Sequence, residues 1–356
     1  MSDPRLLTQV WREPAIVREF GNPDWEALLV LAGRARLIAT MSYRIERCGL
    51  REAVPDKVWN HFQASRVFAD FRNRRILWEM NRLQRVLRQV DFEVIALKGG
   101  AYLLLDLPLA KGRLPADLDV LVRREHLSTL EDLLLNEGWQ DVKLNDYDQR
   151  YYREWMHEIP PLRHPQRGVE VDVHHALLPM TARLHADIEL LWTSARDVET
   201  SQFKVLAPED MILHAVVHLF YDSDFDNRLR DLIDIDEMLR FFSAREGNFW
   251  ESLIRRAEVH GLEKPLTCAL HSTSRILGTP VPSNLSWQAV KPWSVQGMGF
   301  LVGRALLPED PESFNGIDAM VRWLLYVRSH YQRMPLRLLL PHLLYKALST
   351  PDAKSS

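Results

Sequence analysis

The chain has little cysteine, little net charge and no long apolar run. Its two cysteines, Cys48 and Cys268, are too few and too isolated for a disulfide framework or a cysteine-based metal site. A formal net charge of -3 excludes a general attraction to nucleic acid or anionic membranes. No window reaches about 18 uninterrupted apolar residues, and residues 1–6 lack the basic start and apolar run of a signal peptide. We therefore expect a cytoplasmic protein without membrane or long nucleic-acid partners.

The remaining composition is that of a globular protein with a sizeable core. Hydrophobic residues make up 46% of the chain and charged residues 26%. A chain of 356 residues is long enough for two domains or one large one. It contains no internal repeat and no low-complexity segment.

The most informative stretch runs from Val94 to Val122. An apolar run over 94–97 predicts a buried strand that breaks at two glycines and leads into a short helix over about 101–106. A loop containing proline follows, and then a second apolar strand over 113–122. The stretch therefore predicts a strand, a helix and a strand in close succession.

Two aspartates lie in the second strand, where aspartate is rare because its carboxylate faces a core or a neighbouring strand. Period-2 geometry places Asp117 and Asp119 on one face, with Cα atoms roughly 6.6 Å apart. Like charges this close raise each other's pKa unless a cation lies between them. Carboxylate oxygens are ligands that Mg²⁺ prefers, so the pair predicts a divalent-cation site. The alternative is a solvated edge strand.

The two glycines precede the predicted short helix. A Gly-Gly step at a helix start lets backbone N–H groups approach an anion at the positive end of the helix dipole. Gly99 and Gly100, with Lys98 before them, are therefore candidates for phosphate binding. The alternative is a plain strand-to-helix turn. Together with the aspartates, the pattern favours nucleotide chemistry.

A second acidic strand is predicted over 169–175, where valines alternate with Glu170, Asp172 and His174. One face of this strand is apolar and the other is ionisable. If the strand lies beside the aspartate pair, one of its acids completes a set of three carboxylates; the alternative is an edge strand with a wet outer face. His174 and His175 point to opposite faces, so at most one of them serves the same site.

Helical periodicity accounts for most of the remaining chain. We expect helices over 22–48, with Asn22 as the cap, and over 55–89, 125–137, 208–220, 248–260, 265–277, 295–307 and 317–331, and one beginning at 228. Further strands are expected over 139–144, 154–159 and 203–206. Asp234 falls on or near an apolar stripe, from which it would point into a crevice with His218. The pair His214 and His218 lies on one helix face and fits either metal ligands or packed histidines.

The arrangement resembles the polymerase-β-like nucleotidyltransferase superfamily, and more narrowly a bacterial family of uncharacterised nucleotidyltransferases. The resemblance covers about residues 93–239. It is carried by Leu97-Lys98-Gly99, Arg113, Asp117-Leu118-Asp119-Val120-Leu121-Val122, Asp172-Val173-His174, Pro208-Glu209-Asp210, His218 and Asp234. Two departures are a spacing of 18 positions from Gly99 to Asp117 (117 − 99) and Gly100 in place of a frequent serine.

The resemblance implies an α+β fold: a polymerase-β-like core, with a mixed sheet and flanking helices, plus N-terminal helices and a C-terminal helical domain. It also implies Mg²⁺ or Mn²⁺ and a nucleoside triphosphate, for which we expect ATP. The motif of this family implies that the catalytic metal ligands are Asp117, Asp119 and Asp172. Glu170 points to the same face and is the substitute for Asp172. The nucleotide-binding residues are Lys98, Gly99, Gly100 and Arg113, and the candidates on the acceptor side are His174, His218 and Asp234.

The expected activity is transfer of a nucleoside monophosphate from the triphosphate to a hydroxyl or phosphate of an acceptor. That acceptor is a small molecule, a sugar phosphate, a peptide or a protein. The alternatives are a nucleotide-binding or regulatory module with the same fold and no catalysis, and an unrelated helical scaffold with solvated acids. We expect an N-terminal helical region over 1–90, the core over 91–206, a helical domain over 207–350 and a disordered tail over 351–356.

Overall fold

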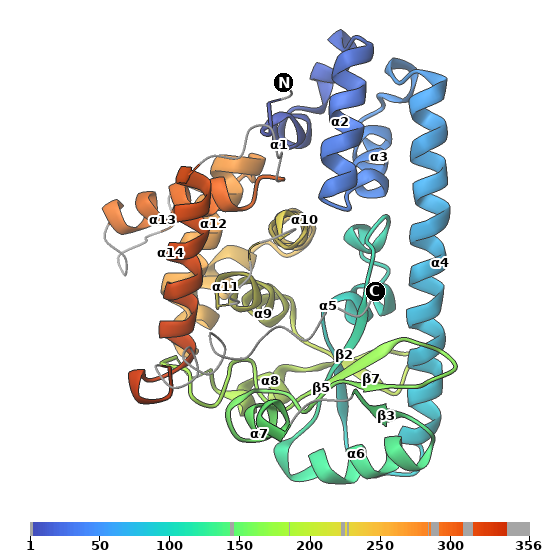
Figure 1. The fold of residues 1–356 in the computed structure, drawn as a ribbon, viewed down its shortest axis with the longest axis vertical. Coiled ribbons are helices and arrows are strands. Elements are labelled where there is room, and N and C mark those ends of the chain that lie inside the picture. The colour runs from blue at the N-terminus through green and yellow to red at the C-terminus, as the bar shows by residue number, and fades with distance from the viewer. Residues whose placement is uncertain are drawn as a thin grey trace.

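The computed structural model describes residues 3–142, 146–184, 186–221, 225, 228–283, 285, 292–308 and 316–339. A twisted sheet with short helices around it occupies one end of the molecule (Figure 1). One long helix runs along one side from this sheet to the N-terminal helices, and the C-terminal helices lie on the opposite side (Figure 1). The fold is mixed α+β, as the sequence predicts.

The N-terminal part is helical. Its helices are α1 (Leu6–Arg12), α2 (Asn22–Arg34), α3 (Ile38–Arg47) and α4 (Asp56–Leu87), with 3₁₀ turns η1 (Pro14–Glu19) and η2 (Arg51–Ala53). The single helix predicted over 22–48 is wrong: the chain breaks after α2, where Arg36 has a φ of 56°. The predicted cap is also wrong, because Gly21 is the N-cap and its N–H donates to Oδ2 of Asp24 at 2.9 Å.

The sheet has seven strands in the order β3-β4-β5-β2-β1-β7-β6. Their bounds are β1 (Val94–Ala96), β2 (Asp117–Leu121), β3 (Gln140–Asp141), β4 (Leu162–Arg163), β5 (Glu170–His174), β6 (Arg196–Asp197) and β7 (Phe203–Val205). β2 pairs in parallel with β5 and antiparallel with β1. The two acidic strands are therefore neighbours in the middle of the sheet.

Several predicted strands are shorter than expected. The strand predicted over 139–144 is two residues long within the described chain, and helix α6 (Leu127–Asn136) connects it to β2. The strand predicted over 154–159 is wrong, because residues 154 and 155 end helix α7 (Asp146–Trp155) and only Glu158 forms a bridge, with His174. The short helices around the sheet are α5 (Lys98–Leu104), α6 (Leu127–Asn136), α7 (Asp146–Trp155) and α8 (Ile188–Ser194), with turns η3 (Pro108–Ala110) and η4 (Arg124–His126).

The helix that follows β1 begins at Lys98, three residues before the position expected from the sequence. Lys98 has a φ of 40°, a left-handed conformation that costs a non-glycine residue on the order of 1 kcal/mol. This one residue turns the chain sharply, so both glycines fall inside the first turn of α5.

The C-terminal part consists of helices packed on one another. They are α9 (Pro208–Tyr221), α10 (Leu229–Ser243), α11 (Phe249–Val259), α12 (Glu263–Leu277), α13 (Pro292–Ala305) and α14 (Gly316–Arg333). Buried side chains from Leu7 in α1 to Leu325 in α14 belong to one hydrophobic cluster. The proposed division into domains stays a prediction, and the predicted tail lies outside the described residues. Among those residues, no helix has the length and apolarity needed to cross a membrane.

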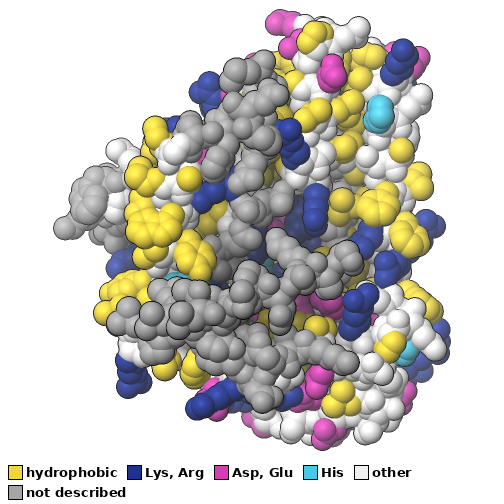
Figure 2. All heavy atoms as spheres, in the orientation of Figure 1, with side chains coloured by type: hydrophobic (Ala, Val, Ile, Leu, Met, Phe, Trp, Pro, Cys, Tyr) yellow, Lys and Arg dark blue, Asp and Glu magenta, His cyan; other side chains and the backbone are white. Residues whose placement is uncertain are grey.

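Exposed hydrophobic side chains are most numerous on α4 and α14. On α4 they include Val67, Phe68, Phe71 and Trp78, and Figure 2 shows hydrophobic side chains along the edge of the molecule where α4 lies in Figure 1. On α14, Trp323 is 61% exposed.

Candidate functional site

Three carboxylates lie on one face of the central strand pair. The register of β2 and β5 pairs Asp119 with Asp172 and Asp117 with Glu170, so side chains at these positions share a face. Oδ1 of Asp172 is buried and has no hydrogen-bond partner among the described residues. Glu170 lies at the outer end of the pair, where its side chain is 44% exposed and 4.0 Å from Arg163. The structure therefore brings Asp172, rather than Glu170, beside Asp119.

Asp119 is the most strongly bound of the three acids. Its Oδ1 accepts a hydrogen bond from Nζ of Lys98 at 2.6 Å and lies 3.0 Å from Nε2 of His174. Burial alone would raise the pKa of Asp119, but Lys98 and His174 hold it well below the ordinary value. Burial likewise opposes the charged form of Lys98, yet Asp119 and Asp117 raise the pKa of its ammonium. Asp119 and Lys98 are therefore both ionised.

The pKa values of the other two acids are raised in these surroundings. The charge of Asp119, followed by burial, raises the pKa of Asp117 above its ordinary value. Burial, followed by the charges of Asp119 and Glu158, raises the pKa of Asp172 to about 9. One lysine thus does not balance the negative charge of this face. A divalent cation with oxygen ligands would balance it and would occupy the unpartnered oxygen of Asp172, so these residues fit the Mg²⁺ or Mn²⁺ expected from the sequence.

The two glycines allow α5 to approach its neighbours closely. A Cβ on Gly99 would lie 2.7 Å from Nη1 of Arg113, and a Cβ on Gly100 would lie 3.0 Å from Cδ1 of Leu118 in β2. Both glycines are buried. The first N–H groups of a helix have no intrahelical acceptor, and those of α5 begin at Lys98. Close packing of α5 therefore favours glycine at both positions, in addition to the phosphate contact that the sequence leads us to expect.

Arg113 and Asp234 form a buried ion pair between the loop before β2 and helix α10. Nε of Arg113 donates to Oδ2 of Asp234 at 2.9 Å, and both side chains are less than a tenth exposed. Burial alone would lower the pKa of Arg113, but Asp234 raises it above its ordinary value. Both residues line a cavity of about 140 Å³, together with Lys98, Tyr102, Asp117, Ala215, His218, Arg228, Arg230 and Asp231. The predicted crevice that holds Asp234 and His218 is therefore present, next to Asp117.

A second cavity, of about 130 Å³, lies on the other side of Lys98. Its polar lining includes His157, Glu158, His174, His214 and His218. Burial lowers the pKa of His214 to about 3, so this imidazole is neutral near pH 7. His175 lies in a different pocket, with Arg123 and Arg124, as expected for adjacent residues of a strand.

Two residues of this second cavity were missed in the sequence. Glu158 lies across from His174 in a single β-bridge, and its Oε2 is 3.5 Å from Nε2 of His174. His157 precedes it, and its ring centroid is 5.2 Å from that of His174. Neither residue belongs to a recognised motif. The sequence offered only a His-Glu pair that is separated by one residue from two prolines.

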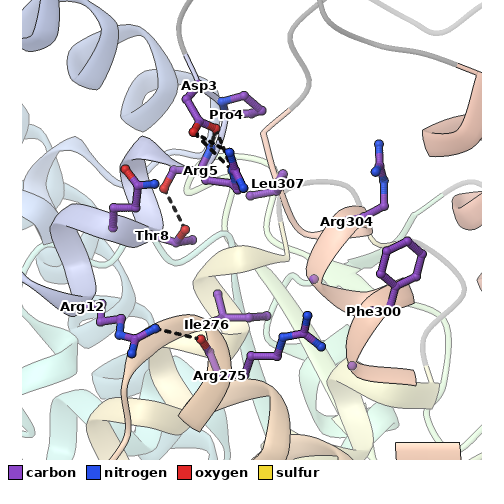
Figure 3. Close-up of a pocket in the computed structure, with 13 residues that line it drawn as sticks. Asp3, Pro4, Arg5, Thr8, Arg12, Arg275, Ile276, Phe300, Arg304 and Leu307 are labelled. Atoms are coloured by element: carbon purple, nitrogen blue, oxygen red, sulfur yellow. Dashed lines mark hydrogen bonds and ion pairs between the residues drawn. The ribbon is translucent and has the colours of Figure 1, made fainter. Parts of the chain in front are cut away.

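A larger cavity than these two, about 560 Å³, lies elsewhere. It is enclosed by α1, α12 and α13, and Figure 3 shows arginine side chains from these helices around it. Asp3 is the one acidic residue of its described lining, and it is paired with Arg5 at 3.0 Å. The cavity has no group of carboxylates or histidines, so the candidate site is the smaller, charged pair of cavities beside Lys98.

A comparison with family models matches residues 21–278 to a family described as uncharacterised nucleotidyltransferase. The match covers more than half of the chain, including both acidic strands, the whole described lining of the 140 Å³ cavity, and that of the 130 Å³ cavity except Arg333. The chain belongs to this family of uncharacterised nucleotidyltransferases. No curated protein and no solved structure matches it.

Membership of the nucleotidyltransferase family confirms the resemblance stated from the sequence. It supports a transferase role. Nucleotidyltransferases generally use a nucleoside triphosphate and divalent metals, and the three-carboxylate face is the part of this chain whose chemistry matches that need.

Proposed function

We propose that the chain is a metal-dependent nucleotidyltransferase that moves a nucleoside monophosphate, with ATP as the expected donor, to a hydroxyl or phosphate of an acceptor. The observation that carries the proposal is the three-carboxylate face of β2 and β5, with the unpartnered oxygen of Asp172 beside Asp119. Its cytoplasmic location stays a prediction from the sequence.

Asp117, Asp119 and Asp172 would hold Mg²⁺ or Mn²⁺. When bound, the ion supplies charge neutralisation for the triphosphate and lowers the pKa of an acceptor hydroxyl. Lys98 keeps Asp119 ionised and in place through the 2.6 Å contact. The carboxylates are thereby ready to accept a cation without rearrangement of the strands.

The 140 Å³ cavity would bind the polyphosphate. Arg113, Arg228 and Arg230 supply guanidinium groups on one side, and Asp117 lies on the same wall. The planar fork of arginine matches the phosphate oxygens of a leaving pyrophosphate. The bond from Nε of Arg113 to Oδ2 of Asp234 holds this guanidinium in the lining of the cavity.

The 130 Å³ cavity would receive the acceptor. It contains His174 and adjoins the first cavity through Lys98 and His218, which line both. In the transfer, an acceptor oxygen forms a bond to the α-phosphorus while the bond to the pyrophosphate oxygen breaks. Asp172 would accept the acceptor proton in its ionised form, which a bound cation favours.

The experiment is incubation with labelled nucleoside triphosphates and a cell extract, followed by mass spectrometry of labelled products and measurement of released pyrophosphate. We expect Mg²⁺-dependent labelling by the wild-type chain and a loss of at least about a hundredfold in Asp117→Asn, a magnitude typical of removing one electrostatic catalytic group. Asp70→Asn, at an exposed position of α4, is the matched control and should retain activity.

Near-normal transfer by Asp117→Asn would refute the assignment of the site. Mg²⁺-dependent ATP binding in calorimetry, without pyrophosphate release for any acceptor, would support the alternative of a non-catalytic nucleotide-binding module. Absence of any Mg²⁺-dependent nucleotide binding would contradict both.

A further inference from the structure

A second group of ligand-type side chains lies next to the three-carboxylate face but is not part of it. His157, Glu158 and His174 each offer one ligand atom, and these atoms all lie within 4.8 Å of one another. His174 is the last residue of β5, and the other two belong to the segment between α7 and β4. The group therefore joins the C-terminal end of β5 to a segment that belongs to no motif recognised in the sequence.

The backbone holds this loop firmly against β5. The N–H of Ile159 donates to the carbonyl of Val173 at 3.1 Å, and the N–H of His175 donates to the carbonyl of His157 at 2.8 Å. These bonds lie on either side of the bridge between Glu158 and His174. Main-chain pairing thus fixes the backbone that carries the three side chains, which is the arrangement expected of a preformed site.

The surroundings of two ring nitrogens in this group indicate a bound proton or cation. Nδ1 of His157 is buried and has no hydrogen-bond partner among the described residues. Nε2 of His174 lies between two carboxylate oxygens, 3.0 Å from Oδ1 of Asp119 and 3.5 Å from Oε2 of Glu158. A nitrogen flanked by two anionic oxygens holds either a proton or a metal cation, and a buried ring nitrogen without a partner is costly unless a ligand satisfies it.

The donor set selects the class of ion. Two imidazole nitrogens and one carboxylate form the ligand set of many zinc sites and of non-haem iron sites, whereas Mg²⁺ prefers oxygen ligands and water. We infer that His157, Glu158 and His174 bind a divalent transition-metal ion of the Zn²⁺, Mn²⁺ or Fe²⁺ class, separate from the carboxylate face.

The site opens into the 130 Å³ cavity. Three protein ligands leave at least one coordination position of a four-coordinate ion for water or for a group of a bound molecule. Lys98 lines the same cavity, but its ammonium is paired with Asp119 at 2.6 Å. Water or a bound molecule would therefore reach an ion at this place from the cavity.

The test uses the full chain after treatment with a chelator, titrated by calorimetry with Zn²⁺ and separately with Mg²⁺. We expect one tightly bound Zn²⁺ per chain. Removal of one ligand, in His157→Asn or Glu158→Gln, should weaken Zn²⁺ binding at least about tenfold, since even changes to outer-shell partners cost that much. The control His61→Asn, at an exposed position of α4, should bind as the wild type does.

The result is separable from the proposed nucleotidyl transfer, because the measurement needs no substrate. Asp117→Asn should retain the Zn²⁺ affinity of the wild type. X-ray absorption of the zinc-loaded wild-type chain gives a second readout if a variant fails to fold, with two imidazole nitrogens and a carboxylate expected. Absence of stoichiometric Zn²⁺ binding, equal affinity in both ligand variants, or a zinc shell without imidazole would overturn the inference.

Discussion

Crowding of carboxylates on one face makes the stability of the metal-free chain depend on pH in an unusual direction. Burial and the charges of Asp119 and Glu158 raise the pKa of Asp172 from 3.8 to about 9. The folded chain therefore keeps a proton on Asp172 at pH values where the unfolded chain has lost it. By linkage, this stabilisation is fully present below pH 3.8 and is lost as the pH rises toward about 9.

The magnitude follows from the size of the shift. Each pH unit between the two pKa values costs about 1.4 kcal/mol of folding free energy. Between pH 4 and pH 7, Asp172 alone should reduce the free energy of unfolding by roughly 4 kcal/mol. Asp172→Asn has no proton to lose, so its stability should fall much less over this interval.

The assay is urea unfolding at a series of pH values in the presence of a chelator. Glu170→Gln is the matched control, because Glu170 lies two positions earlier on the same face of β5 but is 44% exposed at the side chain. We expect the control to follow the wild type. Equal pH slopes for the wild type and Asp172→Asn would show that the three carboxylates do not crowd one another, and would refute the reasoning.

Two further predictions concern the surroundings of the site. Asp210→Ala removes a fully buried carboxylate that accepts from Nε of Arg256 at 2.6 Å, while that guanidinium keeps its bonds to Leu190 and Ser194, so the cost in urea unfolding should be about 1–3 kcal/mol; an unchanged midpoint would contradict it. Gly99→Ala places a Cβ 2.7 Å from Nη1 of Arg113 and should weaken nucleotide binding about tenfold in calorimetry, whereas Gly247→Ala, with no neighbour within 4 Å, should not. Equal affinities in the two alanine variants would be the contrary result.

The acidic strands were predictable because alternation reports directly on strand faces. The valines at odd positions and the acids at even positions of 169–173 led to the expectation that one of these acids meets the aspartate pair, and the family resemblance pointed to Asp172. The register of β2 and β5 places it directly beside Asp119. The helices with long apolar stripes, such as α4 and α9, were also foreseen, since their periodicity is strong.

What the sequence did not reveal depends on contacts between distant residues. Glu158 reaches His174 through a single bridge, which has no periodic pattern of its own. The break between α2 and α3 depends on one residue with positive φ, Arg36, and arginine does not signal such a turn. The ion pair of Arg113 with Asp234 joins residues far apart in the chain, so only their separate motifs could be seen.

The most direct test of the central claim is a Mg²⁺ titration in the presence of a non-hydrolysable ATP analogue, comparing the wild-type chain with Asp117→Asn. If the acidic face of β2 and β5 holds the cation that accompanies the nucleotide, the wild type should bind the analogue only when Mg²⁺ is present, and the variant should lose this dependence together with most of its affinity. Binding of the analogue that is equally strong in both chains, with or without the cation, would contradict the account.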